Sequence, residues 1–238
     1  MAHSQYNYRD TLDRLVRSDT RWLDIGCGHT ILPEWIRGSV DFQKALLSRC
    51  ELARGCDPVD DRPHVAGLTK QVFQGETLPF TDGFFNLVTA NMVIEHVADP
   101  IAFAREVHRV LSKDGLFVAH TSNLYYFEYF IAHFLPSSIV SAVAQMLDGR
   151  GSDDIFPTHY RMNTRSAFQR LPGFKIQSLE CVTTGPKYGK IPVLNLIESG
   201  FIRLASFRGL GDLRSDWVVV LQKKVDNDSI SVQNGFKL

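Results

Sequence analysis

The segment Trp22-Leu23-Asp24-Ile25-Gly26-Cys27-Gly28-His29-Thr30 joins an apolar strand to a turn that contains two glycines. Gly26 and Gly28 can adopt positive φ angles and let a ligand approach the backbone closely. Asp24, at the carboxyl end of the strand, offers an acceptor to a cationic or hydroxylic group. A second strand ends in an acid at Asp57, where a βαβ unit can place a carboxylate on a ribose. The two acidic strand ends predict a site for a nucleotide-type cofactor.

A dinucleotide site is one interpretation of this turn, and the glycine pattern disfavours it. Such a site has the pattern G-x-G-x-x-G, in which the third glycine allows the helix to pack closely on the strand. Counting from Gly26, Ile31 stands in the third place. Asp24 would also repel a pyrophosphate, whereas it would attract a ligand that carries an ammonium or a sulfonium group. A nicotinamide-dependent oxidoreductase is therefore the less favoured alternative.

Three later segments occur in the order expected of one enzyme family. They are Leu78-Pro79-Phe80, Phe84-Phe85-Asn86-Leu87-Val88 and Glu95-His96-Val97-Ala98-Asp99-Pro100. With the glycine turn, they resemble the class I S-adenosylmethionine-dependent methyltransferases, in the ubiquinone-biosynthesis-like branch (methyltransferase type 11). The resemblance covers about residues 20 to 122. It implies an enzyme that transfers a methyl group from S-adenosyl-L-methionine.

The resemblance also implies which residues bind the cofactor. The predicted contacts are Asp24, Gly26 and Gly28 at the methionine end, Asp57 at the ribose hydroxyls, Gln74 with Gly75 beside the adenine, and Asn91 near the methionine portion. Two departures from the family pattern are Thr30, where a glycine is usual, and Gln74, where an acid is usual. An amide can still accept a hydrogen bond from the exocyclic amine of adenine. These departures leave open a second interpretation, a catalytically silent methyltransferase fold that serves as a binding subunit.

Composition favours one enzyme-sized domain. The chain has 238 residues, 44% of them apolar, and we expect a single domain over residues 1–225 and a polar, disordered tail over 226–238. Lys plus Arg and Asp plus Glu number 26 each, so no overall field attracts nucleic acid. The four cysteines lack C-x-x-C spacing and the N-terminus lacks a secretory signal pattern. We therefore expect reduced thiols and a cytoplasmic protein, with peripheral membrane contact left open.

Hydrophobic periodicity predicts alternating strands and helices. Helices are expected over residues 8–17, 31–49 and 100–112, where apolar residues recur at helical spacing, and Pro100 suits a first helical turn. Strands are expected near 21–25, 53–56, 70–73, 84–90, 115–121, 174–182 and 215–223. This alternation predicts an α/β fold: a Rossmann-like, doubly wound, mostly parallel seven-stranded sheet with helices on both faces.

Residues 123–170 do not fit the minimal fold, and we expect an aromatic helical insertion there, before the last two strands. No formally charged residue occurs from Tyr129 to Leu147. Pro136-Ser137-Ser138 divides this run into pieces too short to span a bilayer. The alternatives are helices packed over the sheet, a lid on an apolar acceptor pocket, a membrane-surface contact or a homodimer contact. A similar uncharged run covers Ile191 to Ile197.

Two histidines are the candidate catalytic residues. Methyl transfer from a sulfonium needs alignment and exclusion of water, and a hydroxyl acceptor also needs a base, for which histidine has a well-matched pKa. His96 follows the fourth strand and His159 lies in the loop beyond the insertion. Glu95 and His96 alone are too few ligands for a metal, so none is predicted. We expect a small-molecule or lipid-linked biosynthetic acceptor, with oxygen preferred as the methylated atom.

Overall fold

The computed structural model describes residues 3–59, 67–72, 77–134, 157–185, 188 and 191–224. Its centre is a seven-stranded sheet with the strand order β3-β2-β1-β4-β5-β7-β6. The strands are β1 (Arg21–Ile25), β2 (Leu52–Asp57), β3 (Thr69–Val72), β4 (Phe85–Asn91), β5 (Leu111–Ser122), β6 (Phe174–Val182) and β7 (Asp216–Lys223). Only β7 runs against its neighbours, β5 and β6, so the sheet is mostly parallel, as predicted.

The strand order reverses between β1 and β4: β2 and β3 follow on one side of β1, and the later strands lie on its other side. β1 pairs with β2 on one side and with β4 on the other. Asp24 stands opposite Gly55 of β2 and Thr89 of β4 in this register. Ligands of open α/β sheets bind outside the carboxyl ends of the strands at such a switch point.

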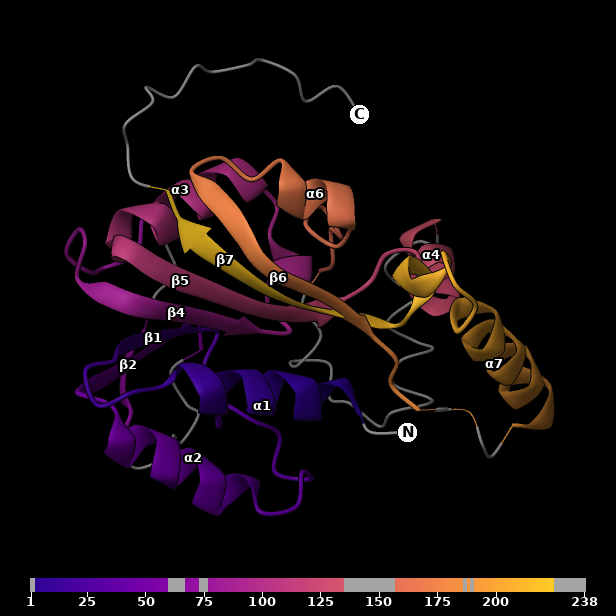
Figure 1. Cartoon of the computed structure of the whole chain (residues 1–238), viewed down its shortest axis with the longest axis horizontal. Coiled ribbons are helices and arrows are strands. Elements are labelled where there is room, and N and C mark those ends of the chain that lie inside the picture. Colours follow the sequence, from indigo (N-terminus) through magenta and orange to yellow (C-terminus); the bar gives the residue numbers. More distant parts are fainter. Residues whose placement is uncertain are drawn as a thin grey trace.

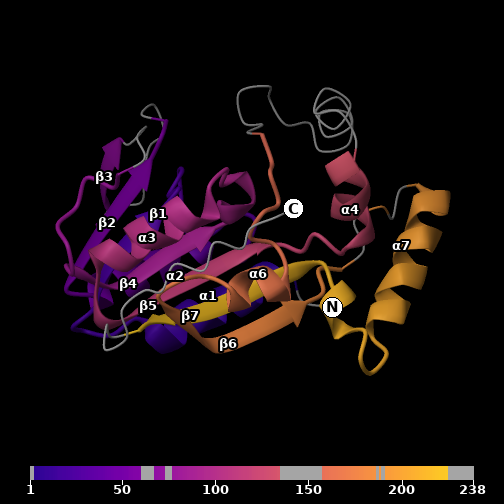
Figure 2. The same cartoon turned by 90° about the horizontal axis from the view of Figure 1, so that it is seen from above.

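Helices cover both faces of the sheet (Figure 1). α1 (Ser4–Leu15) and α2 (Ser39–Arg49) lie on one face, and α3 (Pro100–Val110) and α6 (Arg165–Gln169) lie on the other. α4 (Phe127–Phe134) and α7 (Pro192–Ala205) project beyond the edge of the sheet where β5 ends (Figures 1 and 2). Two short 3-10 helices, η1 (Ile94–His96) and η3 (Gly211–Leu213), complete the described elements.

Alternate residues of each strand supply two separate apolar cores. On the α1 side, Trp22 and Val118 pack with Tyr8 and Leu12 of α1. On the α3 side, the strand residues pack with Ala104, Val107 and Val110 of α3 and with Phe168 of α6. The α1 side becomes polar toward the carboxyl ends of the strands, where the buried residues include Asp24, Thr89, His120 and Asp216. This polar end of the α1 side is where the candidate site begins.

Two predicted helices begin at other residues than expected. The helix expected over 31–49 begins at Ser39, because Gly38 adopts a left-handed conformation (φ +72°) that ends the preceding turns. The apolar residues of those turns, Ile31, Leu32 and Ile36, are nevertheless buried. The helix expected over 8–17 begins at Ser4 and ends at Leu15. Its early start follows from His3, whose ring accepts a hydrogen bond from the backbone N–H of Gln5.

The insertion expected over 123–170 is described only in part. α4 and α6 fall within it, and residues 135–156 and the predicted tail over 226–238 lie outside the described residues. A further helix, α7, occupies the connection between the last two strands, where the sequence showed an uncharged run but no expected helix. Among the described helices, none is long and apolar enough to cross a membrane.

Candidate functional site

The turn after β1 has the glycine conformations that the sequence predicted. Gly26 and Gly28 have φ angles of +67° and +47°, and the Gly26 N–H donates to the Cys56 carbonyl over 2.7 Å. A Cβ atom at Gly26 would lie 2.4 Å from Cγ2 of Val93, so the Val93 side chain would have to move. Gly26 is thus required both by its backbone angle and by the approach of the segment that follows β4.

Asp57 ties the end of β2 to this turn. Its Oδ2 accepts from the Gly28 N–H over 2.8 Å and its Oδ1 accepts from the Val59 N–H over 3.0 Å. The side chain is buried. Each carboxylate oxygen has two lone pairs, so both retain acceptor capacity for ribose hydroxyls. The predicted role of Asp57 remains compatible with this geometry.

Asp24 lies beneath the turn and is only 2% exposed. The Thr89 hydroxyl donates to Asp24 Oδ1, and that hydroxyl accepts from Nε1 of Trp22 over 2.8 Å. Burial raises the pKa of Asp24 to about 7, the negative charge of Asp57 adds to the rise, and the bond from Thr89 opposes it. Asp24 is therefore poised between its neutral and charged forms near neutral pH, and a nearby cation would favour the carboxylate.

The amide of Asn91 is held by the first turn of α1. Asn91 Nδ2 donates to Gln5 Oε1, and Gln5 Nε2 donates back to Asn91 Oδ1, each over 3.1 Å. Nδ2 also donates to the Ile31 carbonyl over 3.1 Å, and Oδ1 lies 2.8 Å from Nδ1 of His120. The structure thus places Asn91 beside Ile31, just beyond the turn after β1, and its amide binds protein groups that the sequence did not reveal. Its contact with the methionine portion of the cofactor stays a prediction.

His120 continues this network into the interior. Its Nε2 lies 3.0 Å from the Ser4 hydroxyl, which lies 3.0 Å from the hydroxyl of Thr184. Thr184 donates its proton to Asp216 Oδ2 over 2.6 Å. Burial lowers the pKa of His120 to about 4, although the charge of Asp216 opposes the shift. His120 is therefore a neutral structural histidine that fastens α1 to β5.

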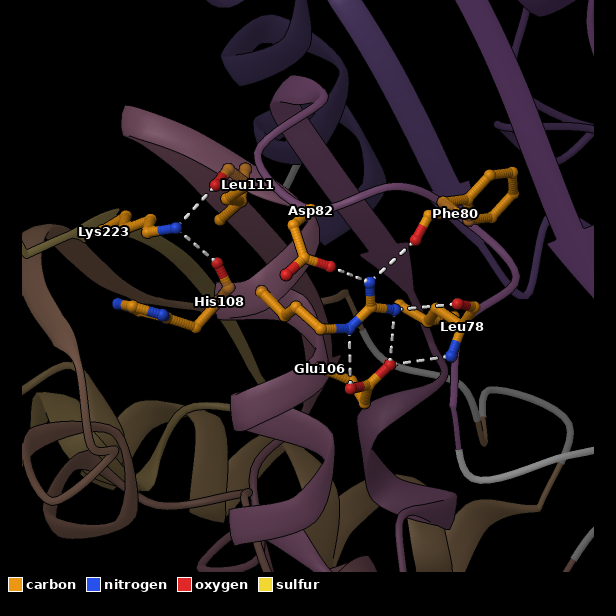
Figure 3. Close-up of polar contacts among 8 residues, drawn as sticks. Leu78, Phe80, Asp82, Glu106, His108, Leu111 and Lys223 are labelled. Atoms are coloured by element: carbon orange, nitrogen blue, oxygen red, sulfur yellow. Dashed lines mark hydrogen bonds and ion pairs between the residues drawn. The ribbon is translucent and has the colours of Figure 1, made fainter.

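Gln74 and Gly75, the predicted adenine contacts, lie outside the described residues, but the segment that follows them is firmly held. Arg109 of α3 donates from Nη2 to the Leu78 carbonyl and from Nη1 to the Phe80 carbonyl, each over 2.8 Å (Figure 3). Glu106 accepts from Arg109 Nε over 3.0 Å and from the Leu78 N–H over 2.8 Å. The hydrogen bonds from Arg109 hold the pKa of Glu106 below its usual value. Leu78-Pro79-Phe80 is thus held firmly against α3, next to the residues for which the sequence predicts the adenine contacts.

The structure brings the two candidate catalytic histidines to one place. His96 Nδ1 lies 2.9 Å from the Pro157 carbonyl, and the His159 N–H donates to the Glu95 carbonyl over 2.8 Å. A carbonyl can only accept, so Nδ1 of His96 is the donor, and in the neutral ring the basic lone pair is on Nε2. Both histidines are partly exposed, in contrast to His120. The junction of η1 with segment 157–160 therefore contains two histidines that are less buried than His120.

A buried carboxyl group supports this junction from below. Glu95 is 4% exposed, and its Oε2 accepts from the Thr121 hydroxyl over 2.8 Å. Asn163 Nδ2 donates to that same hydroxyl over 2.7 Å. Burial raises the pKa of Glu95 to about 7, while hydrogen bonds from its own backbone and from Thr121 oppose the rise. Among the described residues, no three His, Cys, Asp or Glu side chains gather as metal ligands do.

With this geometry established, comparison with known proteins identifies the family. The sequence model of a family described as "Methyltransferase domain" matches residues 1–172. The chain belongs to this methyltransferase domain family. The predicted resemblance to the class I S-adenosylmethionine-dependent methyltransferases is confirmed for family and fold, and S-adenosylmethionine is the cofactor that they imply.

Curated relatives match only part of the chain. The chain is 38% identical over 76 residues to a ubiquinone/menaquinone biosynthesis C-methyltransferase UbiE from Geotalea uraniireducens, which is 32% of this chain and 30% of that protein. It is 42% identical over 79 residues to the protein of the same name from Citrifermentans bemidjiense, 33% and 32% of the two chains. The matched region thus spans about a third of the length of these relatives.

Solved structures share the fold over nearly the whole chain. An S-adenosylmethionine-dependent methyltransferase from Mesorhizobium loti superposes with a TM-score of 0.56 and 16% identity, over 93% of this chain and 99% of that one. The [4+2]-cyclase SpnF superposes with a TM-score of 0.52 and 13% identity, over 92% and 80%. The same architecture therefore occurs in proteins that are named for different reactions.

The residues of this methyltransferase domain fit the cofactor that the family implies. The turn at Gly26 and Gly28 is partly exposed and leaves backbone at the carboxyl ends of the strands, where a ligand can approach. Asp57 retains acceptor capacity for hydroxyl groups. Asp24 is a buried, titratable carboxyl group below the turn, and its negative form would attract an ammonium group. S-adenosylmethionine would thus be held by Gly26, Gly28 and Asp57 from the loops and by Asp24 from beneath.

Several residues of the site escaped the sequence analysis. Thr89 and His120 are polar residues at inward positions of apolar strands, and such an interruption of a strand is itself a signal. Ser4 and Gln5 of α1, which bond to His120 and Asn91, gave no signal, because they precede the predicted start of the helix. Asn163, which is far from β5 in sequence, could be placed beside Thr121 only by the fold.

Proposed function

We propose that this chain transfers the methyl group of S-adenosylmethionine to an oxygen atom of a small-molecule or lipid-linked biosynthetic acceptor. The observation that supports the proposal is that His96 and His159 lie on two segments that contact each other just after β4. Val93, in the same segment as His96, approaches the glycine turn at Gly26. The bound cofactor supplies an activated methyl group on a good leaving group. The chain must supply orientation, a dry site and a place for the acceptor's proton.

The residues at this junction are suited to those tasks. His159 is in the loop that approaches η1, and His96 presents Nε2 as the basic nitrogen when neutral, so either ring can receive a proton from a hydroxyl acceptor. Glu95 holds the loop through its backbone carbonyl, which accepts from the N–H groups of His159 and Tyr160. Loop 157–160 therefore acts as the acceptor-side wall in this proposal.

The test is methyl transfer from S-adenosylmethionine that carries a deuterated methyl group, with hydroxylated candidate acceptors and mass spectrometry of the product. His159→Gln should lower kcat by roughly 100-fold if it is the base, with little change in S-adenosylhomocysteine affinity. Thr158→Ala, an exposed neighbour in the same loop, is the matched control and should retain activity. Unchanged turnover in both His159→Gln and His96→Gln would contradict the proposed base.

The carbon and oxygen alternatives are separated by the product itself. The curated relatives are named as C-methyltransferases, but their match is only about a third of their length, so the acceptor atom stays part of the proposal. Fragmentation of the deuterated product locates the label on carbon or on oxygen. A carbon-bound label would overturn the preference for oxygen and leave methyl transfer intact.

Two departures from the family pattern favour the catalytically silent alternative. Gln74 stands where an acid is usual, and Thr30 stands where a glycine is usual. Calorimetric titration with S-adenosylhomocysteine and with reduced nicotinamide dinucleotide distinguishes the three functions. Saturable binding of the first ligand with product formation supports the enzyme, and binding without any product supports the silent subunit. Binding of the nicotinamide alone would favour the oxidoreductase.

A further inference from the structure

The helix α7 exposes a stripe of large apolar residues and buries its only acid, which departs from the usual pattern of a helix on a globular domain. Val193, Leu196 and Ile197 are 69%, 74% and 51% exposed. The same stripe continues through Leu204 at 44% and Phe207, beyond the end of the helix, at 62%. Single exposed apolar residues are common, but a contiguous stripe of large ones marks a contact surface.

The buried face of α7 fixes this orientation. Glu198 is fully buried, accepts from the Tyr126 hydroxyl over 3.2 Å and accepts from the Tyr188 N–H over 3.1 Å. Phe201 packs edge-on against Tyr126, with ring centroids 5.4 Å apart. Rotating α7 to bury its apolar stripe would break these contacts and expose the aromatic ones. The stripe is therefore directed outward by specific interactions on the opposite face.

The charges around the stripe select the kind of partner. Over residues 191–210, which are all described, Glu198 is the only acid and is buried, whereas Arg203 and Arg208 are exposed. The exposed surface of this segment is thus apolar and basic. An apolar stripe flanked by arginines complements the interface of a bilayer that contains anionic lipids. A two-fold contact with a second copy of α7 would instead bring like charges together.

The position of α7 suits a surface that lies outside the protein. Together with α4, it projects from the edge of the sheet where β5 ends and does not rest on either face (Figures 1 and 2). Phe130 of α4 and Tyr125 before it are also exposed, at 47% and 45%. Exposed apolar side chains on a projecting helix can enter a lipid headgroup region.

We propose that α7 is a peripheral membrane-binding element that inserts the side chains of Val193, Leu196, Ile197, Leu204 and Phe207 into the headgroup region of anionic membranes. This inference does not depend on the acceptor or on the reaction. In this arrangement Arg203 and Arg208 contact lipid phosphates. The carboxyl-end edge of the sheet, where the candidate site lies, is then held near the bilayer.

The experiment is flotation of the full chain with vesicles of phosphatidylcholine alone and of equimolar phosphatidylcholine and phosphatidylglycerol. The wild type should float with the anionic vesicles, and Leu196→Glu should lower partitioning by roughly tenfold or more. Val40→Glu, at a position on α2 that is 45% exposed, is the matched control and should bind like the wild type. Arg203→Gln should lower binding to anionic vesicles about fivefold and leave the weak binding to neutral vesicles unchanged.

Two readouts keep the test decisive. Leu196 is exposed, so the melting temperature of Leu196→Glu should match that of the wild type, which separates lost binding from lost folding. Light scattering without lipid reports the oligomeric state. Failure of the wild type to float, or equal flotation of Leu196→Glu, would overturn the proposal. A wild-type dimer that Leu196→Glu dissociates would also overturn it, since a second copy would then cover the stripe.

Discussion

Asp24 combines complete burial with a carboxyl group that is neutral for part of the physiological range. Its pKa of about 7 arises mainly from desolvation, so a cation that enters the site changes its protonation state. S-adenosylhomocysteine carries an ammonium group that would favour the carboxylate, and binding should then release a proton below neutral pH. With Asp24 as a cofactor contact, the raised pKa would couple cofactor affinity to pH through one residue.

We predict that the affinity for S-adenosylhomocysteine falls as the pH drops below 7, by up to about tenfold per pH unit, because the proton must leave Asp24 before the ammonium group is paired. Asp24→Asn should bind more weakly above pH 7 and lose most of this pH dependence. Calorimetry in buffers of different ionisation enthalpy counts the released protons directly. Asp10→Asn, an exposed change on α1, serves as the control, and an Asp24→Asn protein with wild-type pH dependence would exclude the mechanism.

At the scale of elements, the start of α1 closes the polar end of the site. Gln5 holds this contact, because its amide exchanges two hydrogen bonds with the amide of Asn91. Gln5→Ala leaves the half-buried Asn91 amide partly unpaired. The free energy of unfolding should fall by about 1 to 3 kcal/mol in urea titrations, and cofactor affinity should fall with it. Asp10→Ala, on the exposed side of the same helix, should change the free energy of unfolding by less than about 0.5 kcal/mol. Equal losses of stability in the two variants would contradict a specific role of the Gln5–Asn91 contact.

A second prediction concerns α3, whose Arg109 holds Leu78-Pro79-Phe80. Arg109→Met removes bonds to the carbonyls of Leu78 and Phe80 and leaves Glu106 without its cation. We expect a loss of about 1 to 3 kcal/mol in unfolding free energy and faster hydrogen exchange at the Leu78 N–H. Arg105→Met, an exposed change on the same helix, is the control. Retained exchange protection at Leu78 in Arg109→Met would show that the segment is held by other contacts.

The sequence predicted elements better than it predicted their contacts. Every strand was placed to within about two residues at each end, except for β5, which begins at Leu111, because runs of apolar β-formers bounded by turns are local signals. The wrong start of α2 reflects one backbone angle at Gly38, which residue types do not reveal. The pairing of Gln5 with Asn91 joins positions 86 residues apart and depends on how α1 docks. Motifs thus located the loops of the site, and only packing revealed what holds them.

At the scale of the whole molecule, two buried carboxyl groups, Asp24 and Glu95, have pKa values of about 7 on opposite faces of the sheet. In the unfolded chain, both would titrate near pH 4. Between these values the folded state binds more protons than the unfolded state, so stability rises as the pH falls through 7. His120 acts in the opposite direction, because its folded pKa of about 4 lies below its unfolded value of 6.5.

We therefore predict that lowering the pH from about 8 to about 6 raises the free energy of unfolding by roughly 2 kcal/mol, since the two carboxyl groups together outweigh the single histidine. Below about pH 4.5 the gain ends, because the carboxyl groups of the unfolded chain also become protonated. Urea titrations across this range measure the profile. The variant Asp24→Asn/Glu95→Gln keeps similar side-chain shapes and cannot ionise, so its stability should be nearly flat or slightly decreasing as the pH falls. A double variant that retains the wild-type rise would show that neither carboxyl group has a raised pKa in the folded protein.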